Sequence, residues 1–342
     1  MKSLKVILAI ALVAAIVIGA LYWRRGQTPP AEIRTIEPAP PLAAQGRLRI
    51  HALDVGQGDG LLIVTPAGKA VLIDGGRGEA GGNILAKLRQ LNVPSIDLAV
   101  ASHPHADHIA GLRQVIERFP VKSLLDSGQR YSSVEYERLL EAVKRRGVRF
   151  IAAKRTMSFD LDSGVRLEAF NPQGDGQWIT EVRAGGSVEN ANSVVLRLSY
   201  GDFAMVFTGD AEFETEAVIM KSAANLRAQV LKVGHHGSRH ATSGRFLERI
   251  GPETAIISCG ADNRYSHPAQ LTLDRLKRAN VRVLRTDLSG EITIVSDGKT
   301  YQALSNREAD VNALWVGRIG FEELAAARAG MPRAGNKKEE RD

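Results

Sequence analysis

The chain is organised around one short stretch, Ser102-His103-Pro104-His105-Ala106-Asp107-His108. Three of the eight histidines and one carboxylate fall within it. The apolar run before it, residues 98–101, predicts a buried strand, and the residues from Ile109 to about Phe119 predict a helix. Side chains between a strand and a helix converge on the crevice where α/β sheets bind ligands. Imidazoles and a carboxylate are donors that borderline divalent metals prefer, so the stretch predicts a metal site.

Other polar motifs repeat this placement at the ends of predicted strands. They are Thr208-Gly209-Asp210, Gly234-His235-His236-Gly237-Ser238 and Tyr265-Ser266-His267-Pro268. The four donors of the first stretch suit two neighbouring metals better than one, and Asp210 is suitably placed to bridge them. We expect Asp54, Asp59 and Asp74, also at strand ends, to cap loops or to orient ligating histidines.

Hydrophobic periodicity predicts alternating strands and helices through the rest of the chain. Helices are expected at 83–91, 134–146, 212–220 and 242–250. Hairpins are expected to turn at 162–164 and 200–202, and another at 291–304 closes the pattern. Residues 171–190 are polar and glycine-rich, which predicts a long loop of functional interest.

Together with Asp54-Val55-Gly56-Gln57-Gly58-Asp59, these motifs resemble the metallo-β-lactamase superfamily. The sequence of the first stretch resembles that of the ComEC-like group, which contains the extracytoplasmic domain of DNA-uptake channels. The resemblance covers residues 47–304. It implies an α/β fold of four layers in the order αββα, in which two sheets pack face to face with helices outside and metals at one edge.

The resemblance also implies a binuclear zinc site. Its six ligands are His103 and His105 at the first metal, Asp107, His108 and His235 at the second, and Asp210 between them. The sequence leaves open whether His235 or His236 is the ligand. The candidate catalytic residues are Asp107, His236 and His267, and the candidate substrate-binding residues are Asn190, Ser238, Arg264 and His267.

One departure from the superfamily pattern concerns the first metal. Many members supply a third histidine upstream of the Gly-Asp motif, but no histidine lies between His108 and His235. The sequence Asn190-Ala191-Asn192-Ser193 stands there, as in ComEC-like members. We expect two Zn²⁺ per chain. Because an amide oxygen is a poor zinc ligand beside imidazole, the alternatives for the first metal are weak binding, completion of its ligands by water, or replacement by Mn²⁺.

The resemblance favours a phosphodiesterase or nuclease that acts on single-stranded DNA. The alternatives are an acyl hydrolase of the lactamase or lactonase type and a non-catalytic binding module. Lys232 and Arg264 lie near the histidine motifs and suit a phosphate backbone. The net charge of +7 alone does not argue for nucleic acid, and the single cysteine excludes a cysteine-rich zinc cluster. No protein partner can be inferred.

The two ends of the chain differ from its middle. Val6 to Trp23 carries no charge and as a helix would span about 27 Å, close to the ~30 Å core of a bilayer. We therefore expect a transmembrane anchor over 1–25, with a cleaved signal peptide as the alternative. A Pro/Ala-rich linker (26–46), a catalytic domain (47–306) and a charged mobile tail (307–342) follow. The basic residues around the anchor favour an extracytoplasmic catalytic domain.

Overall fold

The predicted strands assemble into two sheets. The computed structural model describes residues 46–222 and 225–318, which all fall within one compact unit. In these ranges one sheet has eight strands and the other has seven. The expected anchor, most of the linker and residues 319–342 of the expected tail lie outside the described residues. No helix within the described ranges is both long and apolar enough to cross a bilayer.

The first sheet combines the amino-terminal strands with the closing hairpin, in the order β15-β14-β1-β2-β3-β4-β5-β6. Neighbours are antiparallel from β15 to β3 and parallel from β3 to β6. The strands are β1 Leu48–Ala52, β2 Leu61–Val64, β3 Ala70–Ile73, β4 Leu98–Ala101, β5 Ser123–Asp126, β6 Arg149–Ala152, β14 Ile292–Ser296 and β15 Tyr301–Ser305.

The second sheet has the order β13-β12-β11-β10-β9-β8-β7. Strands β7 to β10 form an antiparallel meander, and β10 to β13 are parallel. The strands are β7 Ser158–Asp162, β8 Val165–Asn171, β9 Val195–Tyr200, β10 Phe203–Phe207, β11 Val230–Lys232, β12 Thr254–Ile257 and β13 Arg282–Arg285. Both predicted hairpin turns are therefore confirmed.

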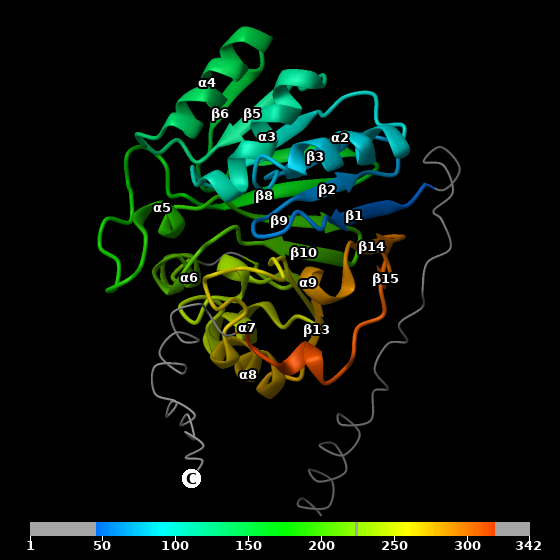
Figure 1. The fold of residues 1–342 in the computed structure, drawn as a ribbon, viewed down its shortest axis with the longest axis vertical. Helices are drawn as coiled ribbons and strands as arrows, with labels where there is room; N and C mark the ends of the chain where they lie inside the picture. Colours follow the sequence, from blue (N-terminus) through cyan, green and yellow to red (C-terminus); the bar gives the residue numbers. More distant parts are fainter. Residues whose placement is uncertain (1–45, 223–224, 319–342) are drawn as a thin grey trace, which may run out of the picture. The chain divides into compact units, whose positions relative to one another are not determined.

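Helices cover the outer face of each sheet, because parallel neighbours need crossover connections. An apolar cluster joins the first sheet to α2 Ala80–Gln90, α3 Ala106–Arg118 and α4 Val134–Arg146. Another joins the second sheet to α6 Phe213–Met220, α7 Gly244–Ile250 and α8 Gln270–Arg278. Figure 1 shows these two groups of helices on opposite sides of the paired sheets. The expected four-layer αββα arrangement is confirmed.

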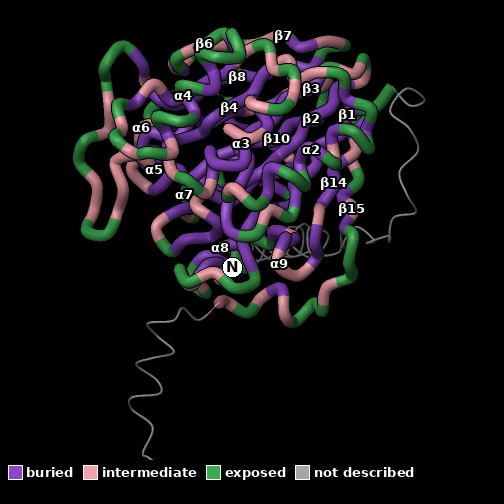
Figure 2. The backbone as a smooth tube through the Cα atoms, turned by 45° about the horizontal axis from the view of Figure 1, so that its top comes forward, coloured by how far each residue is buried: buried purple, intermediate pink, exposed green. Residues whose placement is uncertain are grey.

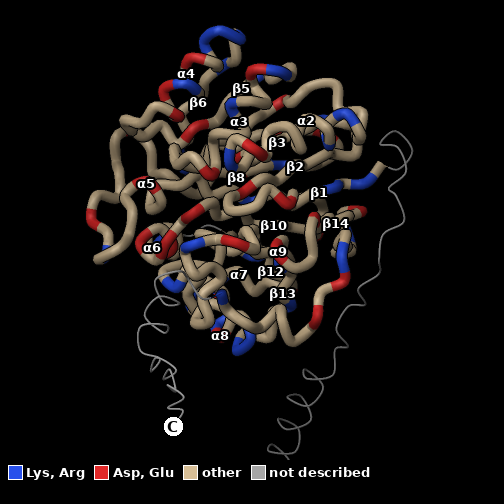
Figure 3. Tube along the Cα trace, viewed as in Figure 1, with Lys and Arg blue, Asp and Glu red and all other residues tan. Residues whose placement is uncertain are grey.

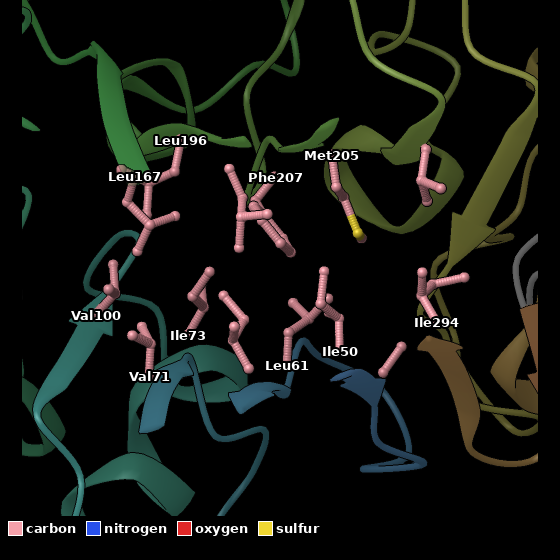
Figure 4. Packing of buried hydrophobic residues seen from close by; sticks show 14 of the residues in the cluster. Ile50, Leu61, Val71, Ile73, Val100, Leu167, Leu196, Met205, Phe207 and Ile294 are labelled. Carbon is pink, nitrogen blue, oxygen red and sulfur yellow. The ribbon is translucent and has the colours of Figure 1, made fainter. Parts of the chain in front are cut away.

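The sheets pack against each other through a third apolar cluster. Ile50 and Ile73 of the first sheet and Met205 and Phe207 of the second are at most 2% exposed, and Figure 4 shows them pointing across the interface. Because both faces of each sheet are covered, strands such as β2 are apolar and buried at every position. Figure 2 shows this buried backbone concentrated in the strands.

The fold continues past the predicted end of the catalytic domain. Arg285 of β13 donates to the backbone oxygens of Ala313, Leu314 and Val316, and Asp287 pairs with Arg318. Leu314, in the 3₁₀ turn η3 Ala313–Trp315, is 6% exposed. Residues 307–318, which we predicted to be part of the charged tail, thus pack against the domain. A buried arginine at the end of β13 holds them there.

Candidate metal centre

Polar side chains from several loops meet at one edge of the two sheets. These loops follow β3, β4, β10, β11 and β12. Each begins at the carboxyl end of a strand, and parallel neighbours end at the same edge. Asp210, which follows β10, is 2% exposed and lies at the middle of the group.

Four histidine rings turn their Nε2 atoms towards the Asp210 carboxylate. From Oδ2 of Asp210, the Nε2 atoms of His103, His108 and His235 lie at 3.8, 3.4 and 3.7 Å respectively. The Nε2 atom of His236 lies 3.4 Å from Oδ1. Residues from two segments, one after β4 and one after β11, therefore face one carboxylate.

The Nδ1 atom of each of these four rings has a hydrogen-bond partner on its outer side. The partners are the Ser102 hydroxyl for His103 at 3.0 Å, Asp74 for His108 at 2.8 Å, Glu212 for His235 at 3.0 Å and the Ser258 backbone oxygen for His236 at 2.9 Å. Three of these are acceptors, and the Ser102 hydroxyl donates to Asp74 and so accepts from His103. When a ring is neutral, this network places its proton on Nδ1 and leaves the Nε2 lone pair free for a cation.

Asp107 belongs to one group of donors that could hold a cation, and His105 lies beside a member of another. Oδ2 of Asp107 lies 3.8 Å from Nε2 of His236, and these two residues form a potential metal-holding group with His108. Nδ1 of His105 lies 3.0 Å from Nε2 of His103. His103 forms a second such group with His108 and Asp210.

This donor set fits divalent cations. The Nε2 atoms of His108 and His236 face each other at 3.3 Å, where two lone pairs repel unless a proton or a cation lies between them. The Oδ1 atoms of Asp210 and Asn190 are buried without a hydrogen-bond partner. Leaving a buried polar atom unpaired costs about 1–3 kcal/mol, which a bound cation would offset at Asp210.

The electrostatics of the centre favour added positive charge. Burial acts to raise the pKa of Asp210, but His236, His108 and His235 hold it well below its usual value. Burial acts to lower the pKa of His236, but the carboxylates of Asp210 and Asp59 together outweigh burial and raise it to about 9. Burial and the nearby His108 keep the pKa of His103 well below its ordinary value, so that ring is neutral. Metal ions would displace protons from this centre.

Close backbone packing sets the position of the first histidine motif. A Cβ atom on Gly111 of α3 would lie 1.9 Å from the Gly75 backbone oxygen, so the helix can approach the loop after β3 only at a glycine. This contact brings Asp74 beneath His108. Gly58 has φ +134°, and a Cβ atom there would lie 2.0 Å from the Asp107 backbone oxygen. The glycine-rich turn before β2 thus supports the metal-binding loop.

The structure separates the two adjacent histidines that the sequence left as alternatives. His236 lies with Asp107 and His108, which is the position the resemblance gave to His235. His235 turns to the other side, where its ring lies 3.4 Å from the Asn190 side-chain amide. Both residues have positive φ, 45° and 53°, which directs consecutive side chains into different parts of the centre.

A pocket of about 620 Å³ opens onto these residues. Asn190 and His267, two of the predicted substrate-binding residues, line it. Burial and the neighbouring His235 keep the pKa of His267 well below its usual value, so its ring is neutral near pH 7. The described lining is Gln57, Arg77, Gly78, Glu79, His105, Ala106, Asp107, Ala110, Asn190, Asp210, His235, His236, Tyr265 and His267.

Three predicted substrate contacts lie elsewhere. Ser238 is 5% exposed and hydrogen-bonds the backbone of His235 and the hydroxyl of Thr272, so it holds the loop together. Arg264 is exposed but is not part of the described pocket lining. Lys232 is fully buried in an ion pair with Asp59, where substrate cannot reach it.

Sequence reasoning missed several residues that the structure places at the centre. Glu212, the outer partner of His235, and the pocket residue Arg77 carried no recognisable motif, and Tyr265 lay in the motif of His267 without being singled out. Of the three strand-end aspartates, Asp74 orients His108, and Asp59 lies 3.4 Å from Nδ1 of His236. Asp54 instead pairs with Arg307. The only sequence signal for Glu212 was its position two residues after Asp210.

Comparison with known proteins shows which family this chain matches. Residues 53–261 match the family model of the metallo-beta-lactamase superfamily. ComE operon protein 3 of Bacillus subtilis is 31% identical over 270 residues, covering 74% of this chain and 33% of that protein. Competence protein ComA of Neisseria gonorrhoeae is 31% identical over 255 residues, covering 74% and 33%. Recombination protein 2 of Haemophilus influenzae is 28% identical over 251 residues, covering 72% and 28%. The chain thus spans about a third of the length of these ComEC-like relatives.

Proposed function

Since this chain belongs to the metallo-β-lactamase superfamily of metal-dependent hydrolases, we propose that it cleaves phosphodiester bonds in DNA with two zinc ions held around Asp210. The observation that carries the proposal is the ring of four Nε2 atoms that face one buried carboxylate. Relatives named for competence and recombination, both processes that handle DNA, support the choice of substrate.

The proposed metal ligands fall into two sets that share Asp210. His103, His105 and His235 would hold the first metal, and Asp107, His108 and His236 would hold the second. In this assignment His235 takes the place of the third histidine that many superfamily members carry elsewhere. Its Nε2 atom lies 3.7 Å from Asp210, and Glu212 fixes its ring from behind. The first metal then has a complete set of imidazole donors rather than an amide.

The chemistry needs an activated water and a stabilised phosphate. Metals held by these residues would lower the pKa of a bound water and would stabilise the negative charge that develops on the phosphate oxygens. Asp107 is partly exposed in the pocket, so its carboxylate is placed to take the proton of the attacking water. The neutral His267 ring and the Asn190 amide can donate hydrogen bonds to non-bridging phosphate oxygens.

The test uses the purified chain loaded with Zn²⁺ or Mn²⁺. We expect hydrolysis of bis-p-nitrophenyl phosphate and of labelled single-stranded DNA, with close to two metals per chain by elemental analysis. Asp210→Asn should lower both rates roughly a hundredfold or more, because each metal loses a ligand. Asp160→Asn, a change at an exposed carboxylate on β7, is the matched control and should act as the wild type does.

Each other result has a distinct meaning. Turnover of nitrocefin alone would show that the protein is an acyl hydrolase and not a nuclease. Two bound metals without turnover of any of these substrates would indicate that the protein is a non-catalytic binding module. Equal activity of wild type and Asp210→Asn would refute the shared-carboxylate centre.

We also propose that residues 1–25 anchor the catalytic domain to a membrane and that the domain lies outside the cytoplasm. The uncharged run from Val6 to Trp23 supports this proposal. Alkaline phosphatase fused at residue 46 should be active in cells. An active cytoplasmic reporter at the same position would reverse the orientation.

A further inference from the structure

The pocket wall carries an aromatic ring that the proposed hydrolysis does not use. Tyr265, in the loop between β12 and α8, lines the pocket and is 47% exposed. Its hydroxyl makes no hydrogen bond with any residue in the described ranges. No polar contact of the hydroxyl therefore accounts for the position of this ring.

The loop that presents Tyr265 is held in place by a single side chain. The Asn263 amide donates to the backbone oxygens of Gly260 at 2.7 Å and His267 at 2.6 Å. Its oxygen accepts from the backbone nitrogens of Tyr265 at 3.2 Å and His267 at 3.1 Å. Because four bonds cross-link the loop, the exposed ring sits on a preorganised support.

The ring also lies close to the metal centre. Its plane is within 28° of the His267 ring, and the two ring centroids are 6.0 Å apart. The His267 ring in turn lies 5.0 Å from that of His235 and 6.2 Å from that of His236, centroid to centroid. A nucleotide whose phosphate lies at the centre would bring its base, one sugar away, to this side of the pocket.

Few of the charges that line the pocket are positive, so contact with a base would add to the affinity for DNA. Arg77 is the one arginine or lysine in the described lining, and it has no ion-pair partner among the described residues. Glu79, Asp107 and Asp210 line the same pocket. Figure 3 shows basic positions interspersed with acidic ones in that view. Attraction of the phosphate backbone by the protein's own cations is therefore weak here, and contact with a base would add to affinity.

We propose that Tyr265 is a stacking platform for an unpaired base next to the scissile phosphate, with Arg77 as the cation for a flanking phosphate. This inference rests on the proposed function and names the pocket residues that would contact an unpaired base and a flanking phosphate. A base inside a duplex is stacked on both faces and cannot lie on the ring without being unstacked, whereas an unpaired base can.

Binding measured without catalysis tests the proposal. The full chain is titrated in EDTA against two labelled oligomers, an oligothymidylate and a chain of abasic spacers of equal length. We expect the wild type to bind the thymidylate about tenfold more tightly, and Tyr265→Ala to bring this ratio close to one. Tyr265→Trp should keep the ratio, because it keeps an aromatic face. Phe150→Ala removes a similarly exposed aromatic ring (45%) on β6 and is the matched control.

The outcomes separate this inference from the proposed function. If Tyr265→Ala weakens binding of both oligomers by the same factor, the ring only supports its loop and the proposal is overturned. An unchanged ratio overturns it as well. If the chain cleaves DNA but shows no preference for the thymidylate, only the stacking role of Tyr265 is refuted. If the chain shows the preference but hydrolyses no phosphodiester, only the proposed function is refuted.

Discussion

Replacement of Asp74 by asparagine tests whether the outer partners set the metal affinity. Asp74 is fully buried and accepts three hydrogen bonds. Oδ1 accepts from the Ser102 backbone nitrogen at 2.8 Å. Oδ2 accepts from the Ser102 hydroxyl at 2.7 Å and from Nδ1 of His108 at 2.8 Å. The carboxylate thus fixes both the loop after β4 and the ring of a proposed ligand.

The size of the effect follows from these three bonds. An asparagine keeps two of them if its oxygen takes the place of Oδ2, and its amide group then opposes the Ser102 backbone nitrogen. One bond to a charged acceptor is lost, which costs about 1.5–3 kcal/mol of unfolding free energy. Because His108 then rests on a neutral acceptor, metal affinity should fall roughly 10- to 100-fold. An alanine would leave three buried donors unpaired, so asparagine is the more informative change.

The assay is competition for Zn²⁺ between the protein and a chromophoric chelator, together with urea unfolding of the metal-free chain. Ser102→Ala provides a comparison that leaves the Asp74 charge in place, since it removes one of the three bonds to Asp74 together with the hydroxyl that accepts from Nδ1 of His103. We expect metal affinity to decrease in the order wild type, Ser102→Ala, Asp74→Asn. If Asp74→Asn bound Zn²⁺ as tightly as the wild type while Asp210→Asn did not, the outer partner would have no role in holding the metal.

Three further outcomes are expected. Burial raises the pKa of Asp126 to about 6. The protonated carboxyl therefore contributes to the free energy of unfolding fully below about pH 4, and this contribution is lost as the pH rises through 6. In urea unfolding, Asp126→Asn should therefore gain up to about 3 kcal/mol over the wild type between pH 4 and 8, and a pH-independent difference would contradict this. Gly58→Ala should lower metal affinity and stability far more than Gly56→Ala, because both have positive φ but only Gly58 would place a Cβ atom against Asp107. Lys232→Met should cost about 3–5 kcal/mol in the same unfolding assay, since it leaves Asp59 buried without its ion pair, and a loss below 1 kcal/mol would argue against that pair.

Local patterns were enough to predict the layers of this fold. Apolar runs such as residues 98–101 become β4, and the helical spacing at 134–146 becomes α4 with the same bounds. These patterns are reliable because burial depends on the spacing of apolar residues along a single element. The donor types of the centre were also readable, since histidines and aspartates at strand ends meet wherever parallel strands share an edge.

The assignment of each donor depended on contacts between distant parts of the chain. Which of His235 and His236 joins Asp107 follows from two positive φ angles that only the packed loop can hold. Asp74 reaches His108 because two glycines let α3 approach the loop after β3. Side-chain direction depends on backbone angles and on neighbours far along the chain, and local spacing carries neither. The residue types of this centre could therefore be predicted from the sequence, while their orientations and the exposed ring of Tyr265 followed from the packing of the elements.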